Sequence, residues 1–254
     1  MFSIERHRKI STLLAKAGKV YVSELAELFG VTQETIRRDL TKMENQKLLK
    51  KIHGGAVNTQ SKFEQKYSER IDVCKDEKTL IARETLKYIK PGDTFFINFG
   101  TTTLEFARHA KYFDNLTVIT NSSKVAGVFQ ENDSSEVILI GGQFLRNKFE
   151  CLGPIALQNM QSLYADYAII SVGAVNIEKG LMNQSLEEAA MARKMSEHST
   201  KTIVLADSSK WYKQGITSVV DWDAVDLFVT DYNKEKDINR ISDLGVNIVV
   251  ARDD

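Results

Sequence analysis

From residue 77 onward, short apolar runs alternate with segments of helical periodicity. The apolar runs span residues 94–99, 116–120, 136–141, 167–173, 202–207, 226–231 and 247–251. Runs that are apolar throughout are typical of parallel strands covered on both faces, and the helical segments between them would supply the right-handed crossovers that such strands need. We therefore expect a Rossmann-like α/β domain with helices on both faces of one sheet.

The start of the chain follows a different pattern, in which three helices are predicted within a short span. A helix over residues 4–17 would be followed by a second helix with Ser23 as its N-cap. Gly30 would end that helix in the left-handed conformation that glycine tolerates, and Thr32 would cap the third helix. Two helices joined by a tight turn that contains glycine predict a helix-turn-helix.

The third helix would bury one face and expose a polar one. Ile36, Leu40 and Met43 recur at helical spacing and would form the buried stripe. Arg37 and Arg38 would face outward. Because adjacent helix residues point about 100° apart, we expect the two arginines to have different roles, with Arg38 reading a base edge and Arg37 holding a phosphate.

A basic wing is predicted directly after this helix, since residues 47–57 alternate lysines with apolar residues and contain a glycine turn. Residues 1–57 carry eleven basic and six acidic side chains, a net charge of +5, and the rest of the chain carries −5. The alternative is a small three-helix interaction module with a solvated basic face. The agreement of turn, caps, stripe and charge favours binding to double-stranded DNA. The residues predicted to contact DNA are Ser23, Thr32, Gln33, Thr35, Arg37, Arg38, Lys42, Lys51, His53 and Gly54.

Polar clusters follow several of the predicted strands in the larger domain. They lie at residues 99–103, 120–123, 141–144, 172–174 and 206–210, and we interpret them as corners where strands lead into helices. Ligands of open α/β sheets bind outside the carboxyl ends of the strands, where hydroxyl groups beside helix N–H groups suit a phosphate. One such cluster alone is equally typical of helix capping, but together they predict a pocket for a polyol phosphate.

In that pocket the threonine loop and Lys210 would hold the phosphate, while Asn121, Asp207 and Glu188 would bind hydroxyl groups. The residues predicted to bind this effector are Gly100, Thr101, Thr102, Thr103, Asn121, Ser122, Gly142, Glu188, Asp207 and Lys210. The expected domain organisation is a DNA-binding domain over residues 1–57, a linker over 58–76, and an effector-binding and oligomerisation domain over 77–254.

Other classes of protein are disfavoured by composition. The two cysteines, Cys74 and Cys151, lack CxxC spacing, so we expect buried free thiols in a reducing compartment. No apolar run reaches about 18 residues and the charged N-terminus lacks a signal-peptide pattern, so a cytoplasmic protein is expected. The four histidines show no metal-ligand spacing, and we expect no metal, no cofactor and no catalytic residue.

The motifs "ERHRKI", "VSELAELFGVTQETIRRDL" and "KKIHGGAV" resemble the winged helix-turn-helix of the DeoR family of bacterial transcription regulators. The body, with "GTTT", "VITNS", "EEAA" and "ADSSK", resembles the sensor domain of the same family, which is similar to ribose-5-phosphate isomerase. The resemblance implies a homodimeric or homotetrameric repressor of a sugar-metabolism operon. It also implies a phosphorylated sugar effector that relieves repression.

Two positions depart from the family pattern. Asn98 stands where an aspartate commonly precedes the threonine loop, and Val175 stands where an acidic residue commonly follows Gly173-Ala174. The loss of two carboxylates removes plausible general bases. An isomerase-like enzyme with an accessory nucleic-acid-binding domain is therefore the weaker alternative. The two departures also leave open whether the effector is the family's usual one or a distinct sugar phosphate.

Overall fold

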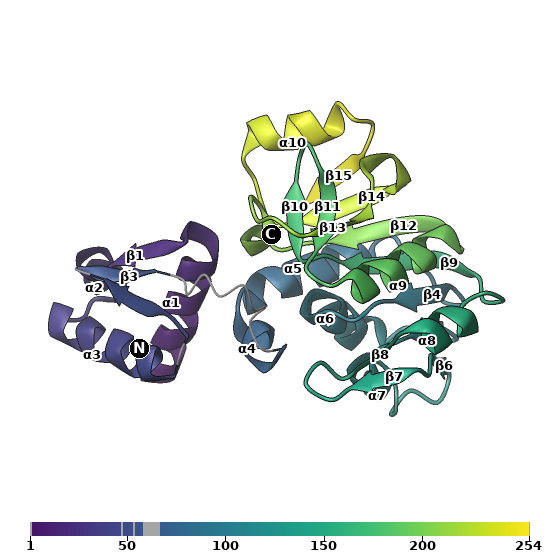
Figure 1. The fold of residues 1–254 in the computed structure, drawn as a ribbon, viewed down its shortest axis with the longest axis horizontal. Coiled ribbons are helices and arrows are strands. Elements are labelled where there is room, and N and C mark those ends of the chain that lie inside the picture. The colour runs from purple at the N-terminus through teal and green to yellow at the C-terminus, as the bar shows by residue number, and fades with distance from the viewer. Residues whose placement is uncertain (1, 47, 53, 58–66, 254) are drawn as a thin grey trace. The chain divides into compact units, whose positions relative to one another are not determined.

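The computed structural model describes residues 2–46, 48–52, 54–57 and 67–253. It divides into two compact units, Met1–Cys74 and Lys75–Asp254 (Figure 1). Of the predicted linker over 58–76, residues 58–66 lie outside the described residues, and a short helix, α4 (Tyr67–Asp72), follows them.

The N-terminal unit is a winged helix-turn-helix. Its helices before α4 are α1 (Ser3–Ala17), α2 (Val22–Phe29) and α3 (Gln33–Asn45). Its strands are β1 (Lys19–Tyr21), β2 (Lys50–Ile52) and β3 (Gly55–Val57). The predicted hairpin of β2 and β3 is joined by β1, in an antiparallel sheet of order β1-β3-β2.

The turns of this unit follow from particular residues. Gly30 ends α2 with a φ of 62°, as expected for a left-handed C-terminal cap. The Thr32 hydroxyl accepts a hydrogen bond from the Thr35 N–H at 3.2 Å, which confirms the predicted N-cap of α3. The prediction that Ser23 caps α2 was wrong, because β1 runs directly into the helix, which begins at Val22 without a side-chain cap.

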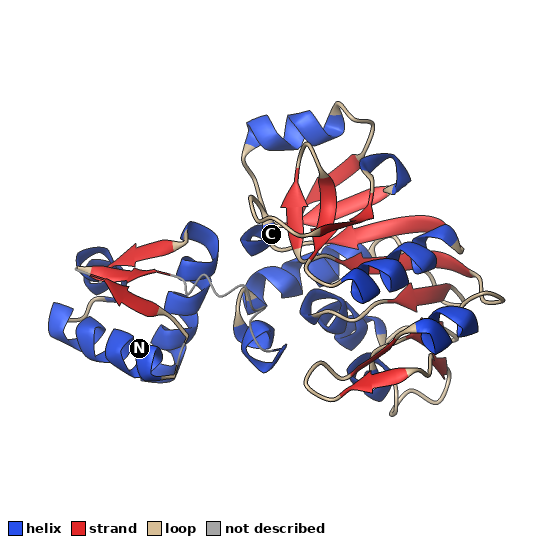
Figure 2. Ribbon diagram, in the orientation of Figure 1, coloured by secondary structure: helices blue, strands red, loops and turns tan. Residues whose placement is uncertain are grey.

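The second unit is built on a seven-stranded parallel sheet of order β15-β14-β12-β9-β4-β5-β6 (Figure 2). The predicted α/β layer with a parallel sheet is therefore confirmed. The strands are β4 (Thr94–Ile97), β5 (Thr117–Thr120), β6 (Glu136–Leu139), β9 (Ala165–Ser171), β12 (Ser199–Leu205), β14 (Leu227–Thr230) and β15 (Asn247–Val250). The helices are α5 (Lys75–Leu86), α6 (Thr101–Ala110), α7 (Ser123–Val128), α8 (Pro154–Asn159), α9 (Leu186–Glu197) and α10 (Glu235–Ser242), with 3₁₀ turns η1 (Ser208–Lys210) and η2 (Trp222–Ala224).

Two small antiparallel sheets were not predicted. One is a hairpin of β7 (Gln143–Leu145) and β8 (Glu150–Leu152). The other joins β10 (Ala174–Asn176), β11 (Gly180–Asn183) and β13 (Thr217–Val220). The prediction that the residues after β6 and β9 are strand-to-helix corners was therefore wrong, since each leads into one of these added strands.

Burial agrees with the expected core. Phe95 and Phe96 of β4 and Phe228 of β14 are fully buried, and both cysteines are buried, as expected. Among the described residues no helix is both long and apolar enough to span a membrane.

The N-terminal core supplies a first test. Leu40 on α3 is 1% exposed, whereas Leu28 on α2 is 63% exposed. We expect Leu40→Ala to lower the free energy of unfolding of the N-terminal unit by about 2–5 kcal/mol, because it leaves a cavity. The matched change Leu28→Ala should cost less than about 0.5 kcal/mol. Chemical denaturation followed by circular dichroism measures both, and equal effects would contradict this packing.

Candidate DNA interface and effector site

Helix α3 has one buried face and one polar face, as the sequence predicted. Ile36, Leu40 and Met43 are at most 1% exposed, whereas Arg37 and Arg38 are exposed. Thr32 and Gln33 lie on the exposed N-terminal end of the helix, which is the part that enters a major groove in helix-turn-helix proteins. The polar face is therefore available to a partner.

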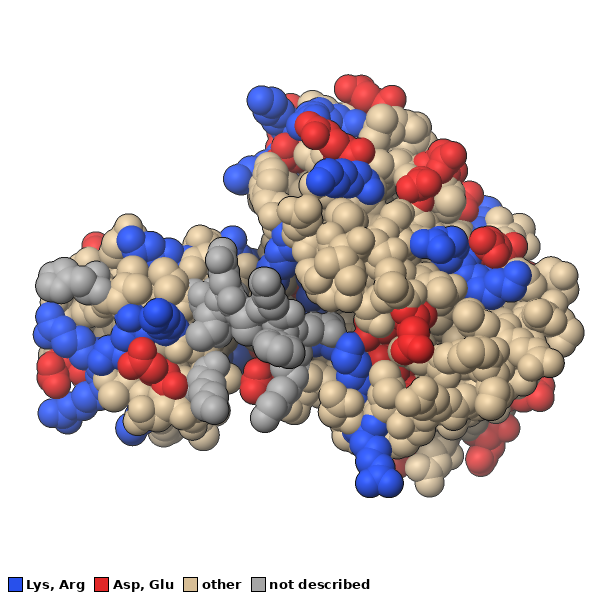
Figure 3. All heavy atoms as spheres, in the orientation of Figure 1, with Lys and Arg blue, Asp and Glu red and all other residues tan. Residues whose placement is uncertain are grey.

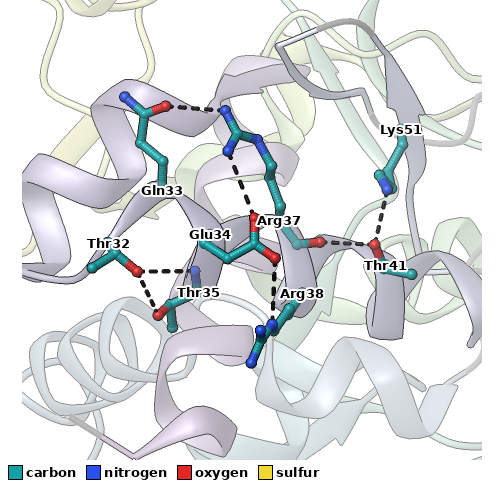
Figure 4. A network of polar contacts seen from close by, with 8 residues as sticks. All are labelled: Thr32, Gln33, Glu34, Thr35, Arg37, Arg38, Thr41 and Lys51. Carbon is teal, nitrogen blue, oxygen red and sulfur yellow. Dashed lines mark hydrogen bonds and ion pairs between the residues drawn. The ribbon is translucent and has the colours of Figure 1, made fainter.

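A network of polar contacts covers this face (Figure 4). The Glu34 carboxylate lies 3.7 Å from Arg37 Nη1 and 3.4 Å from Arg38 Nε. Arg37 Nη2 also donates to Gln33 Oε1 at 3.2 Å. The arginines were expected to have different roles, because adjacent helix residues point about 100° apart, and in this structure both long side chains reach the Glu34 carboxylate.

The wing contacts α3 through a lysine. Lys51 Nζ donates to the Thr41 hydroxyl at 2.8 Å, and the Thr41 hydroxyl donates to the Arg37 carbonyl at 2.8 Å. Figure 3 shows Lys and Arg side chains on the visible face of this unit, with acidic side chains beside them. Of the other predicted DNA contacts, Ser23, Lys42 and Gly54 are exposed, Thr35 is half-buried, and His53 lies outside the described residues.

A buried ion pair, which the sequence did not reveal, holds α3 to α1. Asp39 and Arg6 are 4% and 6% exposed, and Arg6 Nε donates to Asp39 Oδ2 at 2.6 Å. His7 Nε2 donates to the other carboxylate oxygen at 2.9 Å, since a carboxylate can only accept. Burial acts to raise the pKa of Asp39, but the hydrogen bonds from Arg6 and His7 outweigh it and hold the pKa below 3.8. This pair fixes which face of α3 points outward.

The Asp39 pair predicts a pH dependence. Asp39→Asn removes the carboxylate charge that pairs with the buried Arg6, and we expect a cost of about 3–5 kcal/mol near neutral pH. Because the folded-state pKa is lowered, the stability that Asp39 contributes is present above the ordinary pKa of 3.8 and is lost as the pH falls through the lowered value. The difference between the two proteins should therefore shrink below pH 3.8. A difference that stays constant in unfolding experiments through that range would contradict the assignment.

In the second unit, strands after β4 are first added on one side of it, as β5 and β6, and then on the other side, beginning with β9. At this switch in strand order, side-chain hydrogen bonds join the carboxyl ends of β4 and β9. Asn98 Nδ2 donates to the Ser171 carbonyl at 3.0 Å, and the Ser171 N–H donates to Asn98 Oδ1 at 2.9 Å. An aspartate at position 98 could not donate the first bond. Gly100 follows, and a Cβ there would lie 1.8 Å from the Ser171 hydroxyl. The loop into α6 is therefore packed against β9 at the switch point, where ligands of such sheets bind.

Several predicted effector residues have structural roles at this edge of the sheet. The Thr103 hydroxyl donates to the Asn98 carbonyl at 2.8 Å, while Thr101 and Thr102 begin α6 and are buried. Asn121 accepts from the Phe99 N–H at 3.1 Å and donates to the Cys151 carbonyl at 3.2 Å.

Two further residues of the predicted set also support the local fold. Ser122 caps α7, because its hydroxyl accepts from the Val125 N–H at 3.4 Å. Gly142 is tightly packed, since a Cβ there would lie 2.7 Å from the Leu152 carbonyl.

Asp207 and Lys210 lie after β12 at the same edge. Asp207 is 1% exposed; its Oδ1 accepts from the Ser209 N–H at 3.0 Å, and Oδ2 has no hydrogen-bond partner among the described residues. Burial acts to raise the pKa of Asp207, but the charges of Lys210 and Lys78 outweigh it and hold the pKa below its usual range. The strand end therefore carries an ionised carboxylate beside cations. Lys78 on α5 was missed, because it precedes the first strand of the sheet and no motif marks it.

Glu188 is paired with a residue that the sequence did not single out. Lys148, in the turn between β7 and β8, forms an ion pair with Glu188, and its Nζ lies 6.0 Å from the centre of the Phe99 ring. Asn183 Nδ2 donates to the other Glu188 oxygen at 3.1 Å. Nothing in the local sequence pattern connects Lys148 to this site, since the hairpin that carries it was not predicted.

A groove between α8 and α9 has a volume of about 590 Å³ and is lined by Pro154, Leu157, Gln158, Gln161, Ala190, Arg193, Lys194 and Glu197. None of these belongs to the predicted effector set. Within the described part of the chain, no three His, Cys, Asp or Glu side chains gather as metal ligands would.

Comparisons with known proteins agree with this architecture. Residues 6–62 match the model of the DeoR-like helix-turn-helix domain, and residues 73–232 match that of the DeoR C terminal sensor domain. The chain therefore belongs to the DeoR family, and it is a DNA-binding transcription regulator.

Relatives extend over nearly the whole chain. YulB of Bacillus subtilis, an HTH-type transcriptional regulator, is 34% identical over an alignment that spans 91% of this chain and 90% of YulB. The HTH-type transcriptional repressor CsqR of Escherichia coli is 30% identical over 98% of this chain and 96% of its own. The glycerol-3-phosphate regulon repressor of Escherichia coli is 29% identical over 91% and 92%.

The similarity to solved structures is weaker. A D-ribose-5-phosphate isomerase in complex with phospho-erythronic acid covers 54% of this chain and 54% of its own, at 17% identity and a TM-score of 0.41. This level of similarity bears on neither activity nor ligand.

Proposed function

We propose that this protein is a repressor of a sugar-metabolism operon, with operator affinity controlled by a phosphorylated sugar that binds at the carboxyl ends of β4 and β12. The observation that carries the proposal is that the Gly100–Thr103 loop and the Asp207–Lys210 segment follow β4 and β12 of one parallel sheet. Both therefore lie at the same edge, on either side of the end of β9. A helix N-terminus and a lysine suit a phosphate, and a buried carboxylate suits hydroxyl groups. The names of relatives as repressors, one of them of a glycerol-3-phosphate regulon, support the same class of effector.

The proposed mechanism is linkage between two sites. A homodimer or homotetramer would present two copies of α3 to half-sites about one helical turn apart, or a multiple of that spacing. The effector would favour an arrangement of the N-terminal units that no longer matches this spacing. It can act only through different affinities for the two arrangements, so operator DNA must weaken effector binding by the same factor.

An enzymatic role is not proposed. Position 98 carries an asparagine with both of its side-chain polar groups bonded to Ser171, and position 175 carries a buried valine. Neither residue can act as a general base. Turnover of ribose 5-phosphate or a related ester by the purified protein would contradict this view.

The DNA interface is tested by Arg38→Ala. We expect the variant to lose about 1–3 kcal/mol of binding to a duplex selected by the wild-type protein from a random-sequence pool, because a base contact is removed. Binding should be measured at defined salt, since phosphate contacts make affinity salt-dependent. Arg240→Ala on α10 removes the same charge elsewhere and should leave DNA affinity unchanged. Unchanged affinity in Arg38→Ala would refute this role of α3.

The effector site is tested by Lys210→Ala. A thermal-shift screen of sugar phosphates and glycerol 3-phosphate should find an ester that raises the melting temperature of the wild-type protein. Lys210→Ala should weaken binding of that ester by about 1.5–3 kcal/mol, which is the range for a hydrogen bond to a charged group. The variant should retain DNA binding in the absence of the ester. Lys201→Ala, at the opposite end of β12, is the matched control and should respond as wild-type does. An unchanged response in Lys210→Ala would contradict the proposed pocket.

A further inference from the structure

Glu34 occupies an unexpected position for an acidic residue on a surface that binds a polyanion. It is the second residue of α3, and its side chain is 60% exposed on the polar face. A carboxylate near the N-terminus of a helix interacts favourably with the helix dipole. This interaction accounts for a negative charge at position 34 but not for the contacts of Glu34 with the arginines. Glu34 is within ion-pair distance of both arginines of the recognition surface (Figure 4).

The ion pairs with Glu34 involve the same guanidinium groups that would contact DNA. Arg37 is held between Gln33 Oε1 and Glu34, and Arg38 Nε faces the same carboxylate at 3.4 Å. Residues three and four positions apart on a helix lie on one side of it, so all of these groups are presented together. When either arginine extends away from the helix surface toward a phosphate or a guanine edge, its pair with Glu34 opens.

The strength of these pairs decides what opening them does. An exposed ion pair changes an equilibrium by at most about fivefold. Two such pairs therefore do not block DNA binding, but they weaken every complex in which the arginines gain only phosphate contacts. The carboxylate itself also lies where phosphates approach, and non-specific affinity is almost entirely electrostatic.

Among the groups of DNA, only a hydrogen-bond donor on a base edge can pair with the Glu34 carboxylate, because phosphates and their esters carry no donor. In the major groove the donors are the cytosine N4 and adenine N6 amino groups, and carboxylates accept from cytosine N4. Adenine presents its amino group beside the N7 acceptor, an arrangement that suits an amide such as Gln33 better than a carboxylate. Cytosine is therefore the base that Glu34 fits.

We propose that Glu34 is a specificity-determining residue of the recognition helix. On non-operator DNA it retains Arg37 and Arg38 and repels phosphate, and on the operator it accepts a hydrogen bond from a cytosine N4 amino group while the arginines move to the DNA. The inference rests on α3 being the recognition helix of the proposed regulator. In this role the negative charge of Glu34 lowers the affinity for non-specific DNA and raises the discrimination between operator and non-operator sequences.

The test uses the full chain and a random-sequence duplex pool. Selection with the wild-type protein should yield a motif that contains one required cytosine in each half-site. Glu34→Gln keeps the side-chain length but removes the charge. We expect it to bind the unselected pool roughly three- to twentyfold more tightly and to lose the preference for that cytosine while the other positions persist. Its discrimination between the selected motif and the pool should fall about tenfold.

Two further variants separate this role from a helix-stabilising charge. Glu34→Asp keeps a negative charge in the first turn of α3 but is one methylene shorter, and it should also lose the cytosine preference. Glu24→Gln removes an exposed carboxylate from the first turn of α2 and should bind the pool and the motif as wild-type does.

The outcomes are distinguishable. An unchanged motif and unchanged pool affinity in Glu34→Gln would overturn the inference, and so would an equal effect of Glu24→Gln. Failure of the wild-type protein to enrich any motif would instead contradict the proposed function itself.

Discussion

The pairing of β4 with β9 is the constraint on which the second unit depends. These strands are neighbours in the centre of the parallel sheet although the chain between them first builds β5, β6 and the β7–β8 hairpin. Asn98 extends the pairing beyond the last residue of β4 by exchanging two hydrogen bonds with Ser171. Because the strands of this sheet are parallel, the loops after β4, β5, β9 and β12 lie at one edge, and the topology places the candidate effector residues there.

The N-terminal unit depends on a comparable internal contact. Its apolar stripe buries one face of α3, and the Asp39–Arg6 pair fixes the same face against α1. A buried pair of this kind contributes little net stability, since desolvation offsets the attraction. Its effect is on orientation, because it leaves Gln33, Glu34, Arg37 and Arg38 on the opposite, exposed side. The recognition surface is thus defined by what the other face of the helix must bury.

Much of the fold was predictable because local signals agreed with tertiary packing. The Thr32 cap, the Gly30 turn and the spacing of Ile36, Leu40 and Met43 were all found as expected. Where prediction failed, the competing interactions were non-local. Ser23 does not cap α2, because β1 pairs with β3 and brings the chain into the helix two residues earlier, with Tyr21 at the N-cap position. The β7–β8 hairpin was missed because its short strands carry no clear alternation.

The candidate effector site shows the same difference between local signals and non-local contacts. The residue types at the strand ends were visible in the sequence, but their uses were not. Asn121 and Ser122 support the backbone of neighbouring segments, whereas Asp207 retains an oxygen without a hydrogen-bond partner among the described residues. Lys148 joins Glu188 only because the hairpin folds back toward the strand ends.

The amino-acid sequence by itself determined the helices, the parallel strands and the basic N-terminal segment, because caps, periodicity and charge act over a few residues. Only the tertiary structure decided which polar groups meet. Asn98 and Ser171 are 73 residues apart, and Arg6 and Asp39 are 33 apart. Contacts over such separations depend on chain topology and on desolvation, neither of which has a local signature in the sequence.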